Sequence, residues 1–440
     1  MPTRGSAVPG WRTELGSALR EKRARVGVVG LGYVGLPMLV SAVRAGFPGI
    51  GLDLDAERVA SLKAGRSYVG DVTDEVLADL GRRLRVSTNP AVLRSCDVLL
   101  LCVPTPLTDH EPDLGHIERA AAFAAKALRA GVLVILESTT YPGTTEEILR
   151  PVLERSGLTA GRDFALAYSP ERIDPGRGLE HLAKVPKIVG GLTKGDARLA
   201  ARFYRSFVHE VEIVSTPREA EMAKLIENTF RHVNIALVNE LAFLSRDLDV
   251  DLWEAIRAAS SKPFGYMPFW PGPGVGGHCI AIDPSYLSWR VGQRTGHRLN
   301  FVEHAQEVNA KMPGFVAQRV AQALNEVGKP IRGSKVLGIG VTYKADVGDV
   351  RGSPAIAVLE RLAAAGAKVS YHDPLVPSIE MSGRHLRSRA LDPADLATHD
   401  VTVVLTAHST VDFREVVRHA PLVFDARGVT RGRRSNVVRL

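Results

Sequence analysis

Hydrophobic residues near the start of the chain form short runs separated by turns and by one longer periodic stretch. Arg25 to Val29 is apolar and β-branched, an apolar-periodic stretch then runs to Ala45, and Ile50 to Leu52 is again apolar. Short apolar runs bounded by turn residues are typical of buried strands, whereas the longer periodic stretch indicates a helix. The segment therefore predicts a strand, a tight turn, a helix and a second strand.

The same alternation continues through the first half of the chain and returns near its end. The runs CDVLLLCVPTP and GVLVILESTTYPGTT predict two buried parallel strands with polar C-terminal ends, and FALAYSPERIDPG predicts a sixth strand entering a polar loop. The stretch KVLGIGVTYKADVGDVRGSPAIAVLERLAAAGAKVSYHDP repeats the order strand, loop, helix, strand, and further strands are expected at Val401 to Leu405 and at Leu422 to Asp425. We predict an α/β fold with two Rossmann-like parallel-sheet domains joined by a long central helix.

The central helix is predicted from residue 216 onward, in TPREAEMAKLIENTFRHVNIALVNELAFLSRDL. Thr216 is the expected N-cap, Pro217 the first helical residue, and Glu219 completes a capping box. In the third segment, Ser353 and Pro354 are expected to start another helix in the same way.

Two faces of the central helix differ in chemistry. Lys224 and Asn228 lie four residues apart, so their side chains are neighbours, and His232 extends the same face. These polar residues could simply face solvent. A helix of this length between two α/β segments is also a natural place for subunit contacts, and we expect a homodimer through it. The apolar stripe consists of Met222, Leu225, Ile226, Thr229, Val233, Ala236 and Leu237.

Composition narrows the class of protein. A chain of 440 residues, 45% of them hydrophobic, predicts two or three domains. We expect no membrane span and no secretion signal, and three cysteines without CxxC spacing favour a reducing cytoplasm. The formal charge of +8 is spread along the chain without a nucleic-acid-binding motif, so we expect anionic small-molecule ligands and no nucleic acid.

The turn after the first strand predicts a dinucleotide site. Gly30, Gly32 and Gly35 have GxGxxG spacing, which permits the turn, the approach of a pyrophosphate and the packing of helix on strand. Asp53, at the end of the second strand, can accept hydrogen bonds from a ribose diol and would repel a 2′-phosphate, so NAD is favoured over NADP. Arg58 could stack on adenine or meet a phosphate.

Further cofactor residues are expected at the carboxyl ends of the strands, because ligands of doubly wound sheets bind there. The polar loop after the sixth strand carries Glu171, Arg172 and Asp174, and its position at the same sheet edge favours a functional role. The buried cysteines Cys96 and Cys102 are best explained as small apolar residues. Besides the glycines, Asp53 and Arg58, the predicted cofactor set contains Tyr33, Val34, Pro104, Thr105, Ser138 and Thr140, and Glu137 is expected close by.

The motifs GLGYVGLP, SPERIDPG, EMAKLIENTFR, PGPGVGGHCIAIDP and TYKADVGDVRGSP occur in this order across nearly the whole chain after residue 24. Together they resemble the UDP-glucose/GDP-mannose dehydrogenase family. The resemblance implies oxidation of the C6 alcohol of a UDP-sugar to a carboxylate, with two NAD reduced and one water consumed. It implies an extension at residues 1–23 (mobile or helical), an NAD-binding domain at 24–215, a central helical domain at 216–328 and a nucleotide-sugar-binding domain at 329–440.

The resemblance also assigns roles to residues. Cys279 is the implied nucleophile, with Lys224, Asn228 and Asp283 as its polar partners. Glu171 is implied to assist water, and Thr140 to lie near bound water and the nicotinamide. Arg351 is implied to reach the cofactor. The implied substrate-binding set is Glu171, Arg172, Lys224, Asn228, Phe264, Tyr266, Phe269, Gly274, Gly276, His278, Tyr343 and Lys344.

Chemistry explains why such an enzyme needs a thiol. An aldehyde loses a second hydride only after it has become a tetrahedral adduct, and a cysteine provides one as a thiohemiacetal that is oxidised to a thioester. Gly272, Gly274, Gly276 and Gly277 let the loop fold tightly around a sugar. His278 could lower the pKa of the thiol or simply pack, and without a second Cys/His pair we predict no metal site.

The loop motifs are more similar to the branch of the family that acts on UDP-N-acetylhexosamines than to the glucose branch. Phe264, Tyr266, Phe269 and Trp270 could frame an acetamido group, and core packing is the alternative for at least two of them. We predict UDP-N-acetylglucosamine as substrate, with UDP-N-acetylgalactosamine, UDP-N-acetylmannosamine and UDP-glucose as alternatives. A single-step dehydrogenase of the 3-hydroxyacid type and a non-catalytic UDP-sugar and NAD-binding protein are the competing classes.

Overall fold

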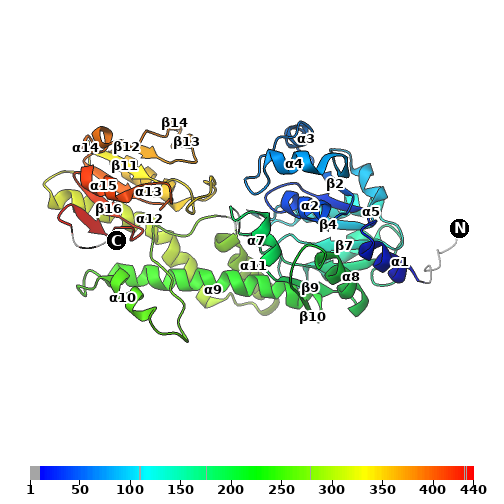
Figure 1. The fold of residues 1–440 in the computed structure, drawn as a ribbon. Helices are drawn as coiled ribbons and strands as arrows, with labels where there is room; N and C mark the ends of the chain where they lie inside the picture. Colours follow the sequence, from blue (N-terminus) through cyan, green and yellow to red (C-terminus); the bar gives the residue numbers. More distant parts are fainter. Residues whose placement is uncertain (1–9, 109–110, 175, 278, 431, 433) are drawn as a thin grey trace. The chain divides into compact units, whose positions relative to one another are not determined.

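The computed structural model describes residues 10–108, 111–174, 176–277, 279–430, 432 and 434–440 (Figure 1). The chain divides into two compact units, residues 1–227 and 228–440, and the division falls within the long helix α9 (Pro217–Leu244). Each unit contains its own parallel-dominated sheet, so the predicted α/β class with two Rossmann-like sheets is confirmed.

In its described part, the first unit is built on a sheet of eight strands. Six of them run parallel in the order β3-β2-β1-β4-β7-β8, which is a doubly wound sheet. β9 pairs with β8 in the antiparallel direction and β10 runs parallel to β9, a reversal that the sequence pattern did not predict. Across the sheet, the strands are β10 (Val211–Val214), β9 (Lys187–Gly191), β8 (Ala165–Tyr168), β7 (Leu133–Leu136), β4 (Val98–Leu101), β1 (Val26–Val29), β2 (Gly49–Leu52) and β3 (Leu84–Ser87).

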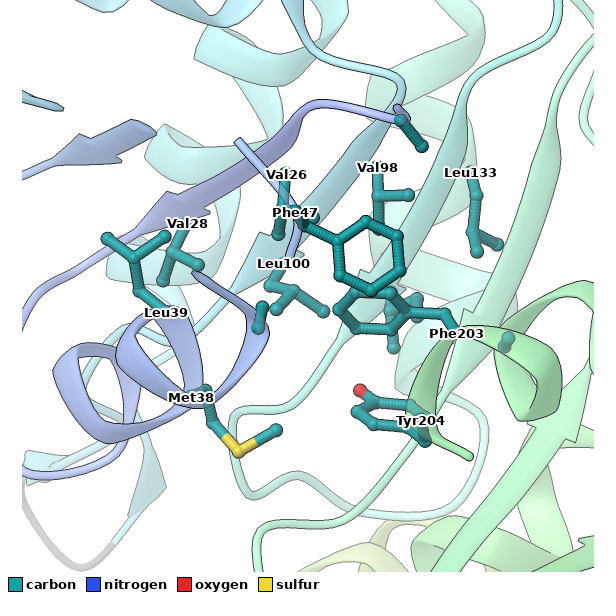
Figure 2. Close-up of a cluster of buried hydrophobic side chains, with 14 of the residues drawn as sticks. Val26, Val28, Met38, Leu39, Phe47, Val98, Leu100, Leu133, Phe203 and Tyr204 are labelled. Carbon is teal, nitrogen blue, oxygen red and sulfur yellow. The ribbon is translucent and has the colours of Figure 1, made fainter. Parts of the chain in front are cut away.

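Both faces of this sheet carry a hydrophobic core. Successive strand residues point to opposite faces, so Val26 and Val28 join one core and Val29 joins the other. Figure 2 shows the first core, where the rings of Phe47 and Phe203 lie 5.7 Å apart between centroids. The first core draws its helical residues mainly from α1 (Trp11–Arg20), α2 (Gly35–Arg44), α4 (Asp74–Leu80) and α8 (Lys194–Tyr204), and the second mainly from α5 (Gly115–Ala127) and α6 (Arg150–Glu154).

Shorter elements connect these layers. A π-helical turn precedes α6, and a two-stranded antiparallel ribbon follows β4. In chain order these elements are α3 (Ala56–Lys63), η1 (Gly81–Arg83), η2 (Pro90–Ser95), β5 (Leu107–Thr108), β6 (Glu111–Pro112), η3 (Thr145–Leu149) and α7 (Leu179–Lys184).

The segment before the first strand contains a docked helix, α1. The buried Trp11 donates its indole N–H to the carbonyl of Arg162 at 2.9 Å. The guanidinium of Arg12 lies 3.1 Å from the carboxylate of Asp196, which is fully buried in the first turn of α8. Of the two states expected for this segment, mobile or helical, residues 11–20 adopt the helical one.

The second unit contains a smaller sheet of five parallel strands, counted over its described residues. Helices α12 (Asn300–Glu326) and α13 (Pro354–Ala364) contribute to the core on one face, and α14 (Pro393–Ala397) and α15 (Phe413–His419) to the core on the other. The strands are, in sheet order, β12 (Lys368–His372), β11 (Lys335–Ile339), β15 (Val401–Val404), β16 (Val423–Asp425) and β17 (Val437–Arg439). The remaining elements are α10 (Leu252–Ala259), α11 (Cys279–Thr295) and the hairpin β13 (Ser378–Met381) and β14 (Arg384–Arg387).

Helix α9 begins as the sequence predicted. Its first residue is Pro217, and the backbone N–H of Thr216 donates to the carboxylate of Glu219 at 2.9 Å. This contact is one half of a capping box, and the Thr216 hydroxyl accepts from the Arg218 N–H at 3.2 Å. Among the described helices, none combines the length and the apolar composition that crossing a bilayer requires.

Candidate active site

The turn after β1 has the shape that a dinucleotide pyrophosphate requires. Gly30 has a left-handed backbone (φ +90°), and a β-carbon there would lie 2.4 Å from the carbonyl oxygen of Cys102. A β-carbon on Gly35 would lie 1.8 Å from the carbonyl oxygen of Gly30, so helix α2 packs this closely only with glycine. A β-carbon on Gly32 would meet no described atom within 4 Å. The backbone at Gly32 is therefore open to a phosphate, and the residues present fit NAD.

Asp53 follows β2, at the edge where the ribose of a dinucleotide binds in this fold. Its carboxylate accepts the N–H groups of Leu31, at 2.8 Å, and of Asp55, at 3.0 Å. The guanidinium of Arg58 lies 3.8 Å from this carboxylate and 5.6 Å from the ring centroid of Tyr68. The structure thus brings Asp53 and Arg58 together at the predicted position, and their contacts with NAD stay a prediction.

The other predicted cofactor residues lie at neighbouring strand ends. The hydroxyl of Ser138 accepts the N–H of Val103 at 2.9 Å and donates to its carbonyl at 2.8 Å, which joins the ends of β4 and β7. Thr140 is fully buried, and its hydroxyl has no hydrogen-bond partner among the described residues. A buried hydroxyl without a protein partner is suited to a ligand or a water molecule. Tyr33 and Pro104 are exposed, Val34 is the N-cap of α2, and Thr105 is buried.

Lys224 and Glu171 form a buried ion pair. Their side chains are only 6% and 8% exposed, and the ammonium of Lys224 lies 3.1 Å from the carboxylate of Glu171. The same ammonium donates to the backbone carbonyl of Glu171 at 2.6 Å. The neighbouring Arg172 is held by Glu227, at 2.7 Å, and by the carbonyl of Pro186. The loop after β8 is therefore attached to α9 by two ion pairs.

One helical turn before Lys224, Glu221 anchors α9 to the segment that follows Thr140. Its fully buried carboxylate accepts the N–H of Gly143 at 2.6 Å, and both the N–H and the hydroxyl of Thr145, at 2.9 and 2.7 Å. Burial raises the pKa of Glu221 to about 7, although these hydrogen bonds oppose the shift. The chain segments that carry Thr140 and Lys224 are thus fixed to each other.

In the second unit, Asn228 donates its amide to the carboxylate of Asp283 at 2.5 Å, and both side chains are buried. Cys279 is the first residue of α11, four residues before Asp283. The side chain of Cys279 and the whole of His278 lie outside the described part of the structure, so their predicted roles are carried by the sequence alone.

The glycine-rich loop before Cys279 packs against the loop between β11 and α13. A β-carbon on Gly276 would lie 2.6 Å from the ring of Pro354 and 2.8 Å from the side chain of Tyr343, so only glycine fits. The N–H of Gly277 donates to the carbonyl of Arg351 at 3.2 Å. The predicted substrate residues Gly274, Gly276 and Tyr343 are therefore neighbours within the second unit.

The charged residues of the loop between β11 and α13 have partners of their own. The guanidinium of Arg351 pairs with Asp349 at 2.6 Å, and more than half of its side chain is exposed. Lys344 is partly buried, and its carbonyl accepts the hydroxyl of Thr342 at 2.9 Å. The predicted roles of Lys344 at the substrate and of Arg351 at the cofactor stay predictions.

The aromatic residues before the glycine-rich loop have different environments. Phe264 is 69% exposed and Tyr266 is 40% exposed, whereas Phe269 packs edge-on against Phe230 with centroids 5.7 Å apart. Trp270 stacks on Trp253 at 5.5 Å. Core packing thus explains Phe269 and part of Trp270, and a contact of the exposed Phe264 and Tyr266 with the sugar stays a prediction.

The polar face of α9 is buried, which contradicts the solvent-facing alternative for Lys224 and Asn228. His232 continues this face, is 2% exposed, and has no hydrogen-bond partner on either ring nitrogen among the described residues. Burial lowers the pKa of His232 to about 4, so the ring is neutral at physiological pH.

The apolar stripe predicted for α9 is only partly buried. Two of its members, Ile226 and Leu237, are more than half exposed.

Arg427 is a candidate that the sequence reasoning missed. It follows β16, and its guanidinium would lie 2.5 Å from a β-carbon on Gly272, so it packs directly on the glycine-rich loop. Burial lowers the pKa of Arg427, with the charge of Asp425 acting in the opposite direction. The only local signal in the sequence was a charged residue two positions after a predicted strand.

The two cysteines of the first unit are buried, and burial disfavours their thiolate forms. Burial raises the pKa of Cys96 to about 12, and that of Cys102 well above its ordinary value. Their interpretation as buried small apolar residues is confirmed.

Comparison with known families covers most of the chain. Residues 24–208 match the NAD binding domain of the UDP-glucose/GDP-mannose dehydrogenase family, residues 218–311 match its central domain, and residues 337–432 match its UDP binding domain.

Individual relatives align with this chain over almost their full length. The chain is 36% identical to the UDP-N-acetyl-D-mannosamine dehydrogenase of Escherichia coli strain K12, over 93% of this chain and 99% of the relative. It is 33% identical to the UDP-N-acetyl-D-glucosamine 6-dehydrogenase of Salmonella typhi, over 94% and 98%. Among solved structures, the UDP-D-ManNAc dehydrogenase of Pyrococcus horikoshii matches with a TM-score of 0.85 at 32% identity, covering 94% of this chain and 98% of that one.

Proposed function

The chain belongs to the UDP-glucose/GDP-mannose dehydrogenase family, whose members are NAD-dependent nucleotide-sugar dehydrogenases, and we propose that it oxidises the C6 hydroxymethyl group of a UDP-N-acetylhexosamine to a carboxylate. The observation that carries the proposal is the pair of buried polar contacts made by α9, Lys224 with Glu171 and Asn228 with Asp283. A protein that only binds its ligands would gain little from burying these groups, since buried charges contribute little to stability.

The matched segments support a proposed assignment of roles to the domains. We propose that residues 24–215 hold NAD, that 216–328 carry the catalytic loop, and that 329–440 hold the nucleotide-sugar. Gly32, Asp53 and Arg58 would bind the phosphates and the adenosine ribose of NAD. When bound, NAD supplies the hydride acceptor for both oxidations.

We propose that residues of the chain carry out the two oxidations at C6 in the following way. Lys224, or a water held by Asp283, takes the proton of the alcohol. The thiolate of Cys279 adds to the carbonyl carbon of the resulting aldehyde and forms a thiohemiacetal, whose oxidation gives a thioester. Lys224 and Asn228 stabilise the oxyanion of each tetrahedral adduct by charge and by hydrogen bond.

Hydrolysis of the thioester completes the reaction. Glu171 would take a proton from water, the oxygen of that water would bond to the acyl carbon, and the sulfur of Cys279 would leave as thiolate. The buried hydroxyl of Thr140 is a suitable donor or acceptor for this water, since no described residue pairs with it. Neutral His232 and the guanidinium of Arg427 are further candidates for contacts with the substrate.

The identity of the hexosamine is the most specific part of the proposal. Relatives at similar identity are named for UDP-N-acetyl-D-mannosamine and for UDP-N-acetyl-D-glucosamine, which differ in configuration at C2 of the sugar. UDP-N-acetylglucosamine therefore stays a prediction, and its C2 epimer, for which more of these relatives are named, is the main alternative.

We also propose that the protein forms a homodimer through α9. Five large apolar side chains of this helix are 44–55% exposed in the single chain, and their spacing of three, four or seven residues repeats along one side. A second copy of the helix would cover them. Light scattering of the purified protein measures the mass directly. The exposed residues are Ile226, Phe230, Leu237, Leu241 and Leu244.

A substrate panel with NADH counted per sugar tests the function. UDP-N-acetylglucosamine, UDP-N-acetylmannosamine, UDP-N-acetylgalactosamine and UDP-glucose are each incubated with excess NAD. We expect two NADH per sugar consumed with a UDP-N-acetylhexosamine, and a Cys279→Ser variant that yields no uronate. One NADH per sugar together with an active Cys279→Ala variant would instead identify a single-step dehydrogenase. Binding without any NAD reduction would identify a non-catalytic protein.

A further inference from the structure

A second buried lysine lies next to the Lys224–Glu171 pair and takes no part in the chemistry proposed above. Lys187, in β9, is 6% exposed, and its ammonium lies 2.8 Å from the carboxylate of Glu137. Glu137, directly after β7, is fully buried, and its second oxygen accepts the hydroxyl of Tyr204 at 2.5 Å. The charge of the lysine is therefore neutralised by a carboxylate that is itself fixed by a second donor.

The second partner of Lys187 is the backbone of the loop after β8, which carries Glu171. Its ammonium donates to the carbonyl of Pro170 at 3.0 Å, and that of Lys224 donates to the carbonyl of the next residue, Glu171, at 2.6 Å. Two consecutive peptide groups are thus held by ammonium groups from β9 and α9. Because a peptide group is planar, fixing both carbonyls fixes the α-carbon of Glu171 between them and the direction of its side chain.

Further contacts cross-link the same two segments. The hydroxyl of Ser169 donates to the carbonyl of Ile188 at 2.7 Å, and the guanidinium of Arg172 donates to the carbonyl of Pro186. The side chains of Ser169, Arg172 and Lys187 therefore each bind a carbonyl group of the opposite segment. This exchange takes place where β9 reverses direction against β8, the one antiparallel junction of the sheet.

A buried ion pair is weak evidence for stability, because two apolar side chains of similar volume would often stabilise the fold as well. An apolar pair could not donate to the carbonyl of Pro170. We propose that Lys187, oriented by Glu137 and Tyr204, is a positioning residue that fixes the Pro170–Glu171 peptide so that the carboxylate of Glu171 can activate the hydrolytic water. The inference rests on the proposed function, in which Glu171 has that role.

The test uses the double variant Lys187→Met/Glu137→Gln, which removes both buried charges and so avoids an unpaired one. Lys187→Arg keeps the charge and the reach, and Lys184→Met, at an exposed lysine three residues away, is the matched control. In the double variant we expect kcat to fall about tenfold or more while the KM for the UDP-sugar changes less than about threefold. Acid-quenched enzyme should accumulate a sugar acyl adduct on Cys279, because hydrolysis is the slowed step. Lys187→Arg should keep most of the activity, and Lys184→Met all of it.

Coupling to Glu171→Gln separates positioning from a general structural effect. If Lys187 acts through Glu171, adding the double substitution to Glu171→Gln lowers kcat by less than about twofold further, since the interaction is already lost. The inference would be overturned if the two sets of substitutions lowered kcat by the product of their separate effects. It would also be overturned if Lys187→Met/Glu137→Gln folded and kept the wild-type kcat. If Lys187→Met/Glu137→Gln does not fold, the same criteria apply to Tyr204→Phe, which leaves the ion pair in place.

Amide hydrogen exchange provides a readout that does not depend on turnover. Peptides covering residues 169–174 should exchange faster in the double variant and at the wild-type rate in Lys184→Met. Wild-type enzyme that consumes sugar without forming uronate refutes the proposed function, whereas unchanged exchange in these peptides refutes the positioning role by itself.

Discussion

The two α/β units begin with the same turn and use it differently. In both, the first strand ends at a glycine with a left-handed backbone, at φ +90° for Gly30 and +80° for Gly340. Each glycine N–H donates to a carbonyl at the end of the neighbouring strand at 2.8 Å. The N–H of the next residue donates to an aspartate, Asp53 at 2.8 Å in the first unit and Asp373 at 2.7 Å in the second. The backbone geometry is shared, although only the first turn has GxGxxG spacing.

The surroundings of the two aspartates differ. The side chain of Asp53 keeps 11% of its surface exposed, and helix α2 starts at Gly35, directly after the turn. Asp373 is buried and accepts the imidazole N–H of His408 at 3.1 Å, and in this unit the longer loop 341–353 separates the turn at Gly340 from α13. The first carboxylate is therefore suited to a ribose, and the second is a structural group. We propose that the ligand contacts of the second unit lie instead in the long loop, where Tyr343 packs against the glycine-rich loop.

The largest expected effect comes from adding a methyl group at the shared glycine. A β-carbon would lie 2.4 Å from a carbonyl oxygen at Gly30 and 2.5 Å from one at Gly340, so each alanine variant should lose about 3 kcal/mol or more of unfolding free energy. We expect Gly30→Ala to abolish NAD binding and Gly340→Ala to abolish UDP binding, as measured by calorimetry. Gly157→Ala and Gly333→Ala share a φ of +85° without a close neighbour among the described atoms, and should cost only about 1–2 kcal/mol. Loss of NAD binding in Gly340→Ala would contradict the conclusion that the two turns serve different ligands.

Exchanging each aspartate for asparagine should separate the ligand role from the structural one. Asp373→Asn removes the charge that accepts from His408 and two backbone N–H groups, so we expect a loss of about 2 kcal/mol in stability with an unchanged KM for NAD. Asp53→Asn should leave the thermal midpoint nearly unchanged and raise the KM for NAD roughly tenfold or more. Urea titrations and steady-state kinetics on both variants provide the measurements. Equal stability losses without any kinetic difference would contradict the distinction.

A substitution at Gly32 should weaken NAD binding without affecting the fold. Because a β-carbon there meets no described atom within 4 Å, Gly32→Ala should fold with a thermal midpoint within about 1 °C of the wild type. The methyl group would occupy space that the pyrophosphate approaches, so the KM for NAD should rise roughly tenfold with the affinity for UDP unchanged. A KM equal to that of the wild type would remove the glycine from the cofactor site.

The smallest expected effect is a difference in acid stability. Although burial acts to raise it, hydrogen bonds from His408 and from backbone N–H groups hold the pKa of Asp373 below its ordinary value. This stabilisation is fully present above the unfolded pKa, about 4, and is lost as the pH falls through the lower folded value. Asp373→Asn should therefore show a flatter decline of stability below pH 4 than the wild type. Tryptophan fluorescence can follow it, since three of the four tryptophans, all but Trp11, belong to the second unit.

The sequence predicted features that local sterics or local hydrogen bonds determine. The strand, turn and helix around Gly30, Gly32 and Gly35 follow from the space that each glycine leaves. The start of α9 follows from Thr216, Pro217 and Glu219, which act within a single turn. Both were expected in the places where the structure has them.

Features that depend on residues far apart in the chain could not be predicted. Helical periodicity separated the face of Lys224 and Asn228 from the apolar stripe, but it could not tell which face would be buried. The pairing of Lys187 with Glu137 joins residues fifty positions apart, and it depends on the reversal of β9. The shared turn of the two units was hidden because the glycines around Gly340 lack the familiar spacing.

Helix α1 should be retained in any shortened version of this chain. A version starting at residue 24 would keep every segment matched by the family domains. It would also strip the only ionic partner of Asp196 in the described structure and uncover the part of the core that Trp11, Leu15 and Leu19 fill. Such a truncation would be expected to express poorly and to aggregate, even though it retains all the proposed catalytic residues. Expression designs should therefore start upstream of residue 10 and place any affinity tag before it.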